Sequence, residues 1–264
     1  MNSQKIQIDS KIQISYNYRK SENGLTLVFI HGLGSTKNDF QAAFQSNILQ
    51  QYGLIAIDLV GHYDSSTPTN FTYRMDTQAK VLKKAISILD LQDDLILVCH
   101  SMGGPIGIYL AEYLKEKVKG IVYAEGNLDE NDCFFSLSII EQYTYQEWLN
   151  IGHMTVLSNL EEMSEGIDLL YAQSFNKAGP IATYKSSLDL VKESRNGRLF
   201  NRLVSLEIPV LVIYGENNKE KYTSETTLAK RFRINYIPDA GHDMMLRNPT
   251  IFYEVIRGFL NLFT

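Results

Sequence analysis

The fold of this 264-residue chain is indicated most clearly by the stretch Leu95-Ile96-Leu97-Val98-Cys99-His100-Ser101-Met102-Gly103. Its first five residues form a short apolar run, typical of a parallel strand that is buried on both faces. From Met102 onward apolar residues recur at helical spacing, and Pro105 falls in the first helical turn, where a missing N–H costs nothing. The stretch therefore predicts a strand, a tight turn with Ser101 at its tip, and a helix.

Ser101 stands where such a turn can present a nucleophile. A serine on so tight a turn leaves the ordinary backbone regions, and the turn closes only when the residues two before and two after it are small. These residues are Cys99 and Gly103, and Cys99 is larger than the glycine that is usual there. The alternative is that Ser101 is an ordinary helix N-cap. We interpret Ser101 as the candidate nucleophile because the rest of the chain supplies matching groups.

Length and composition describe one globular domain, or one domain with an insertion. Hydrophobic residues make up 44% of the chain, and the net charge of −5 comes from dispersed residues, so no binding surface for nucleic acid is expected. No apolar run approaches the length of about 18 residues that a membrane helix needs, and we expect a soluble, cytoplasmic protein without a membrane partner. Cys99 and Cys133 are expected to be reduced thiols. The oligomeric state stays open.

Short apolar runs alternate with helical stretches along the chain. Residues 5–9 and 11–18 alternate apolar and polar side chains, which predicts an antiparallel hairpin. Buried strands are expected at residues 25–30, 54–57, 95–99, 121–123, 209–214 and 234–237. A helix is expected at residues 76–89, with Asp76 as its cap. The alternation predicts an α/β fold, in which flanking helices cover a mostly parallel sheet.

One long segment without a convincing strand interrupts this alternation. We interpret residues 128–203 as an inserted helical cap, and residues 1–127 and 204–264 as the core domain. Rings are concentrated in the cap, and each of them either packs the cap onto the core or meets a substrate. The residues that we expect in a substrate pocket are Phe134, Tyr143, Trp148, His153 and Tyr171, together with His31 of the core.

Reactive groups follow several of the predicted strands. Because the carboxyl ends of parallel strands meet in one crevice, these groups are expected to lie close together. Gly32 follows the run 25–30 and lets backbone N–H groups approach an oxygen, so the N–H groups of Leu33 and Met102 are the expected oxyanion donors. His242 follows the last run and is the expected general base, since imidazole titrates near neutral pH. The histidines show no metal-ligand spacing, and neither a metal nor a cofactor is expected.

The carboxylate partner of His242 is in an unusual place. Such an acid often follows the strand that corresponds here to residues 209–214, but Asn218 stands where an aspartate is expected, and Glu216 comes too early. Glu125 directly follows the strand after the nucleophile strand and is the better candidate. The alternative for Glu125 is that it caps a neighbouring helix or pairs with a lysine.

These motifs resemble the α/β-hydrolase superfamily over nearly the whole chain. The matching residues are His31-Gly32, Asp58-Leu59-Val60-Gly61-His62, the turn at Ser101, and Gly241-His242 followed by Asn248-Pro249. Placing the acid after the strand that follows the nucleophile strand resembles haloalkane dehalogenases, although those enzymes have an aspartate where this chain has Ser101. The resemblance implies the α/β-hydrolase fold, the acid placement and a helical cap, but not dehalogenation.

The candidate residues predict a carboxylesterase-like serine hydrolase. Ser101 attacks a carbonyl, His242 takes and returns the proton, and Glu125 orients the imidazole. The expected partner is a small-molecule substrate, namely a small to medium apolar ester, thioester or lactone. One alternative is that the same triad cleaves a carbon–carbon bond or transfers acyl groups. Another is a small-molecule receptor with little turnover, which Asn218 favours because a neutral amide supplies no charge to the base.

Overall fold

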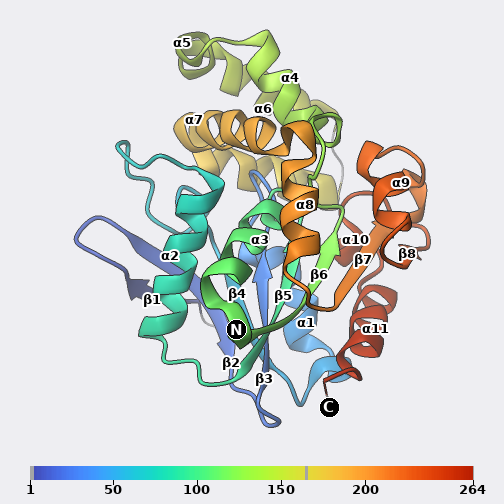
Figure 1. Cartoon of the computed structure of the whole chain (residues 1–264). Coiled ribbons are helices and arrows are strands. Elements are labelled where there is room, and N and C mark those ends of the chain that lie inside the picture. The colour runs from blue at the N-terminus through green and yellow to red at the C-terminus, as the bar shows by residue number, and fades with distance from the viewer. Residues whose placement is uncertain (1–2, 164–165, 264) are drawn as a thin grey trace.

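The computed structural model describes residues 3–163 and 166–263, in which helices cover both faces of a central sheet (Figure 1). The eight strands lie in the order β1-β2-β4-β3-β5-β6-β7-β8. The hairpin of β1 (Gln4–Gln7) and β2 (Gln13–Arg19) is antiparallel, and β2 also pairs antiparallel with β4. The other neighbouring strands are parallel. The predicted hairpin and the mostly parallel α/β sheet are confirmed.

The parallel strands lie on the apolar runs. They are β3 (Leu25–Ile30), β4 (Gly53–Ile57), β5 (Asp94–His100), β6 (Val118–Ala124), β7 (Val210–Gly215) and β8 (Ile234–Ile237). Along β3, Val28 and Ile30 belong to one hydrophobic cluster, and Leu27 and Phe29 belong to the other. Because alternate side chains of a strand point to opposite faces, a strand that is covered on both faces is apolar throughout.

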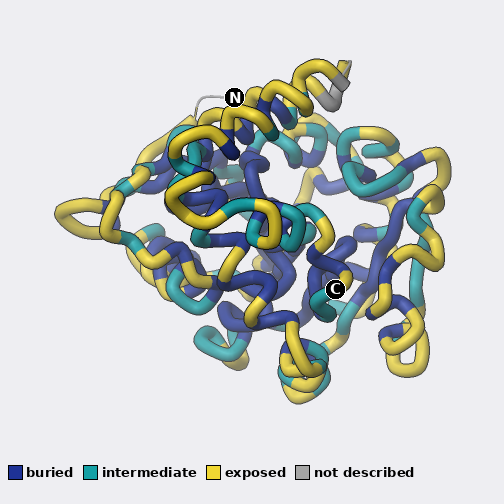
Figure 2. Tube along the Cα trace, turned by 90° about the horizontal axis from the view of Figure 1, so that it is seen from above, coloured by how far each residue is buried: buried dark blue, intermediate teal, exposed yellow. Residues whose placement is uncertain are grey.

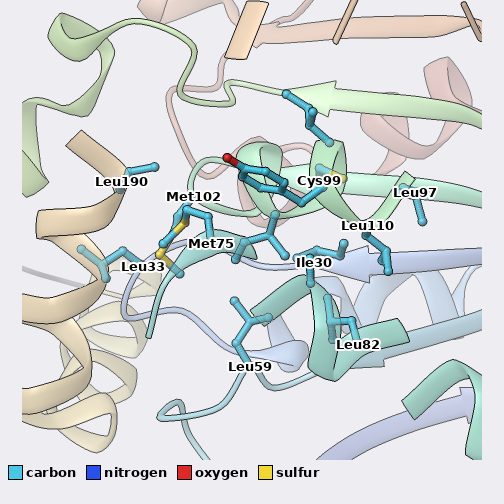
Figure 3. Packing of buried hydrophobic residues seen from close by; sticks show 14 of the residues in the cluster. Ile30, Leu33, Leu59, Met75, Leu82, Leu97, Cys99, Met102, Leu110 and Leu190 are labelled. Atoms are coloured by element: carbon cyan, nitrogen blue, oxygen red, sulfur yellow. The ribbon is translucent and has the colours of Figure 1, made fainter. Parts of the chain in front are cut away.

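Each face of the sheet has its own helices. On one face lie α2 (Met75–Ile88), α3 (Gly103–Leu114) and α8 (Arg198–Ser205), whose apolar side chains join the first cluster. Figure 3 shows Leu82 of α2 and Leu110 of α3 within this cluster. On the other face lie α1 (Gln41–Gln45) and α11 (Pro249–Leu260), which join the second. In the view from above, the central trace is largely buried and the outer loops carry exposed stretches (Figure 2).

The start of α2 differs from the prediction. The helix begins at Met75, so Asp76 lies inside its first turn and does not cap it. The backbone N–H of Met75 instead donates to Asp189 of α7 (Ile167–Ser194), at 2.8 Å from Oδ2. Asp76 pairs with Lys80 one turn further along the helix, at 2.9 Å. A carboxylate far away in the sequence therefore takes the role that the local sequence pattern assigned to Asp76.

A group of helices between β6 and β7 lies over the carboxyl ends of the strands (Figure 1). Besides α7 it contains η4 (Glu130–Cys133), α4 (Phe134–Gln142), α5 (Tyr145–Glu147), η5 (Trp148–Gly152), α6 (His153–Met163) and η6 (Arg195–Gly197). The division into a core and a cap stays a prediction, and α8 crosses the predicted boundary after residue 203. Among the described residues, no helix has both the length and the apolarity to cross a bilayer.

Candidate active site

Ser101 lies on a strained turn between β5 and α3. Its φ of 52° falls in the left-handed region, which non-glycine residues rarely adopt. Its N–H donates to the carbonyl oxygen of Ala124 at 3.1 Å, and its own carbonyl accepts from the N–H of Gly104 at 2.8 Å. A Cβ on Gly103 would lie 2.3 Å from the carbonyl oxygen of Ile30, so only glycine fits there. The predicted strand, turn and helix around Ser101 are all present.

Cys99 fits at a position where glycine is usual because the facing helix makes room for it. A Cβ on Gly107 of α3 would lie 2.2 Å from the sulfur of Cys99. The thiol is fully buried among core side chains (Figure 3) and makes no disulfide. Burial raises the pKa of Cys99 well above its usual range, so the thiol is not reactive. Cys99, two residues before Ser101, therefore fills the space that Gly107 leaves on α3.

The imidazole of His242 contacts Glu125. The distance from Nδ1 of His242 to Oε2 of Glu125 is 2.7 Å, and the Glu125 side chain is 0% exposed. Glu125 directly follows β6 with a φ of 44°, and its N–H donates to the carbonyl oxygen of Ile213 at 3.0 Å. Glu216, the other acid considered from the sequence, is exposed. Of these two glutamates, Glu125 is the one whose carboxylate contacts His242.

Three further donors hold the carboxylate of Glu125. The N–H of Gly215 donates to Oε1 at 2.8 Å, and Nδ2 of Asn218 lies 3.2 Å from Oε1 and 3.0 Å from Oε2. The hydroxyl of Tyr222 donates to Oε2 at 2.7 Å and lies 2.9 Å from Nδ1 of His242. Asn218 therefore supplies a hydrogen bond to the acid, and the missing charge is carried by Glu125. Sequence reasoning missed Tyr222, for which the local pattern holds no signal.

Asp132 of η4 connects the segment after β6 with the segment that carries Tyr222. Its carboxylate accepts from the N–H groups of Leu128 at 3.2 Å and Asp129 at 3.0 Å, close to the end of β6. It also accepts from the N–H of Ser224, at 3.2 Å, near the start of α9 (Thr223–Ala229). Ser224 lies two residues after Tyr222, so Asp132 fixes the segment that carries this tyrosine.

The acid and the base shift each other's pKa. Burial alone raises the pKa of the Glu125 carboxyl, but the hydrogen bond and charge of His242 and the Tyr222 hydroxyl outweigh it and hold the pKa below its usual value. Burial lowers the pKa of His242, and the hydrogen bond and charge of Glu125 outweigh that effect and raise the pKa. An ionised acid beside a more basic imidazole is the arrangement that proton transfer from a serine requires.

Ser101 and His242 line one cavity of about 190 Å³ beneath the helices. Its walls also include Leu33, one of the expected oxyanion donors, and Tyr222. The apolar residues Phe134, Phe135, Leu160 and Leu190 complete one side. Since a water molecule occupies about 30 Å³ in the liquid, the cavity has room for a small organic group. Two of the predicted pocket residues, Phe134 and Tyr171, lie in its wall.

The four other residues predicted for the pocket lie outside the walls of this cavity: His31, Tyr143, Trp148 and His153. His31 is fully buried, and its Nε2 accepts from the N–H of Leu59 at 3.0 Å. Burial lowers the pKa of His31 to about 4, so it is neutral. The other three rings pack among themselves and against Phe175, and Trp148 donates to the carbonyl oxygen of Pro180 at 2.9 Å. They form an internal core of the helical group.

The family model for the alpha/beta hydrolase fold matches residues 26–150. This span runs from β3 through the turn at Ser101 to the first helices after β6. The chain has the α/β-hydrolase fold. Within that fold, the expected place of the acid after β7 is taken by Asn218, and the carboxylate follows β6 instead. In the described part of this α/β hydrolase, no group of three His, Cys, Asp or Glu residues is placed to hold a metal ion.

Several known proteins are similar to this α/β hydrolase. Protein PHYLLO of Arabidopsis thaliana is 22% identical over an alignment of 273 residues, gaps included. The alignment covers 91% of this chain and 16% of that protein. Lipase 3 of a Moraxella species is 36% identical over 102 residues, which cover 38% of this chain and 32% of the lipase. The chain thus spans less than two thirds of either relative. A solved N-acyl homoserine lactonase, complexed with N-hexanoyl homoserine, has a TM-score of 0.77 at 16% identity, covering 100% of this chain and 97% of that one. That likeness concerns the fold.

Proposed function

We propose that this chain is a carboxylesterase-like serine hydrolase that cleaves small apolar esters through an acyl-enzyme. The observation that carries the proposal is the 2.7 Å contact between Glu125 and His242, which lines the same cavity as Ser101. The strained turn at Ser101 and the raised pKa of His242 support it. The similarity to a protein named as a lipase agrees with ester cleavage. Thioesters and lactones have the same acyl chemistry and belong to the proposed substrate class.

In the proposed mechanism, the Ser101 hydroxyl attacks the ester carbonyl while Nε2 of His242 accepts its proton. Glu125 stabilises the imidazolium, and the N–H groups of Leu33 and Met102 hold the oxyanion. His242 then gives the proton to the leaving alcohol. Water attacks the acyl-enzyme with His242 again acting as base, which releases the acid and restores Ser101. The cavity of about 190 Å³ limits the substrate to a small acyl group.

The test is labelling with a fluorophosphonate probe, read by intact mass, together with hydrolysis of short nitrophenyl esters. We expect one probe per chain on the wild type and none on Ser101→Ala. Ser158→Ala is the control because Ser158 is an exposed serine of α6, and it should label and turn over as the wild type does. A folded wild type that neither labels nor turns over would overturn the proposal and favour a receptor. Labelling of Ser101→Ala would place the nucleophile elsewhere.

A further inference from the structure

Tyr171 of α7 connects the helices above the cavity to the loop that carries an oxyanion donor. Its hydroxyl donates to the carbonyl oxygen of Leu33 at 3.1 Å. The N–H of the same Leu33 is the donor proposed for the oxyanion. The N–H and the carbonyl of Leu33 lie in neighbouring peptide planes that are joined only through φ and ψ, so a bond to the carbonyl restrains the N–H by limiting the movement of the loop backbone at this residue. Burial raises the pKa of Tyr171 beyond its usual range, so its hydroxyl stays a donor.

Phe175 of α7 makes a second contact with this loop, at Gly34. Gly34 has a φ of 69°, and a Cβ there would lie 2.6 Å from the ring of Phe175 and 3.3 Å from the Tyr171 hydroxyl. Tyr171 and Phe175 are four residues apart on α7, so they lie on the same side of the helix. Two neighbouring rings of one helix thus hold the backbone of the loop from Leu33 to Gly34.

Tyr171 lies in the walls of two cavities, and Asp243 is also in both walls. It lines the catalytic cavity of about 190 Å³ and a second cavity of about 270 Å³. The walls of the second cavity include Leu170, Leu246 and Tyr63, together with polar and charged residues such as Asp39 and Lys177. The two cavities together have more than twice the volume of the catalytic cavity alone.

We propose that Tyr171 sets the upper limit on the acyl chain that this enzyme accepts; the inference rests on the proposed function. A short acyl chain ends inside the catalytic cavity and leaves the bond from Tyr171 to Leu33 intact. A longer chain has to displace the ring, which breaks that bond and loosens the oxyanion donor. Tyr171 therefore acts as a positioning residue for short substrates and as a barrier to long ones.

The experiment measures kcat and KM for nitrophenyl esters from acetate to decanoate with the wild type and three variants. Tyr171→Phe keeps the ring and removes the hydroxyl, so we expect kcat on short esters to fall about tenfold with KM within about twofold and the length preference unchanged. Tyr171→Ala also removes the ring, and its preference should move to longer chains. Tyr184→Phe is the matched control because it removes a tyrosine hydroxyl that donates at 3.1 Å to the carbonyl oxygen of Tyr143, away from the oxyanion loop. It should behave as the wild type.

A trifluoromethyl ketone, which forms a tetrahedral adduct with the nucleophile, supplies a second readout. Its affinity should fall in Tyr171→Phe by the same factor as kcat/KM, because both depend on the oxyanion donor. An active wild type with unchanged kcat in Tyr171→Phe, an unchanged length preference in Tyr171→Ala, or an equal loss in Tyr184→Phe would each overturn the inference alone. A wild type inactive on every ester would overturn the proposed function and this inference with it.

Discussion

Replacing Glu125 by glutamine tests the acid at the centre of the site. The carboxylate accepts from Gly215, Asn218, Tyr222 and His242, and it has no donor of its own. A glutamine has one acceptor oxygen and one NH₂ donor, so its NH₂ faces buried donors whichever way the amide turns. An unsatisfied buried donor costs about 1–3 kcal/mol of unfolding free energy.

The catalytic loss in Glu125→Gln should be larger than the loss of stability. When the amide NH₂ faces Nδ1 of His242, the imidazole has to carry its proton on Nε2, the nitrogen that must accept the proton of Ser101. The wrong tautomer is then favoured and the charge that stabilises imidazolium is lost. A carboxylate-to-amide change in a serine protease triad lowers kcat about 10⁴-fold, and we expect a loss of about this size here.

The assay is nitrophenyl acetate hydrolysis, with thermal unfolding of the same samples to show that Glu125→Gln is folded. Glu216→Gln is the matched control, because Glu216 is an exposed glutamate in the loop after β7. It should keep wild-type kcat. The reasoning is refuted if folded Glu125→Gln stays within about twofold of wild type, or if Glu216→Gln loses as much activity.

The remaining predictions concern neighbours of the nucleophile and the base. Because the base must be neutral, kcat/KM should fall as the pH drops through the raised pKa of His242; a midpoint below the ordinary histidine value of about 6.5 would contradict this. Gly107→Ala forces a Cβ to 2.2 Å from the sulfur of Cys99 and should lower the unfolding free energy, measured in urea, by about 1–3 kcal/mol. Combining Gly107→Ala with Cys99→Ala should recover most of the lost unfolding free energy. If none is recovered, the loss does not come from the contact with the sulfur of Cys99. Tyr222→Phe removes one hydrogen bond to Glu125 and should lower kcat by about tenfold; a loss as large as that of Glu125→Gln would contradict its supporting role.

The strands were predictable because burial on both faces leaves a direct mark on the sequence. Residues 25–30 coincide with β3, and all six of its residues are buried. The places of Ser101 and Glu125 in the fold were predictable for a related reason, since each directly follows such a strand and the topology brings the strand ends together. The apolar runs indicated the sheet, and the sheet in turn indicated where to search for reactive groups.

Contacts that depend on how helices turn were not predictable. Tyr222 reaches Glu125 across 97 positions of sequence, and no periodicity marks it. Trp148 and Tyr171 both lie in the ring-rich segment, but Trp148 is fully buried inside the helical group and Tyr171 lines the cavity. Which role a ring takes depends on the side of its helix that faces the strands, and composition does not contain that information.

The position of Asp132 limits how the helices of this protein can be exchanged. Residues 128–203 look like a module that could be exchanged for another to change the substrate. Such a graft would remove Asp132, and with it the anchor for the backbone at Ser224, beside the tyrosine that supports Glu125. Residues 128–203 thus carry residues that face the cavity as well as the contact that supports Glu125 through Ser224 and Tyr222. A chimera of this chain should keep residues 128–132 with the core and begin the exchange after them.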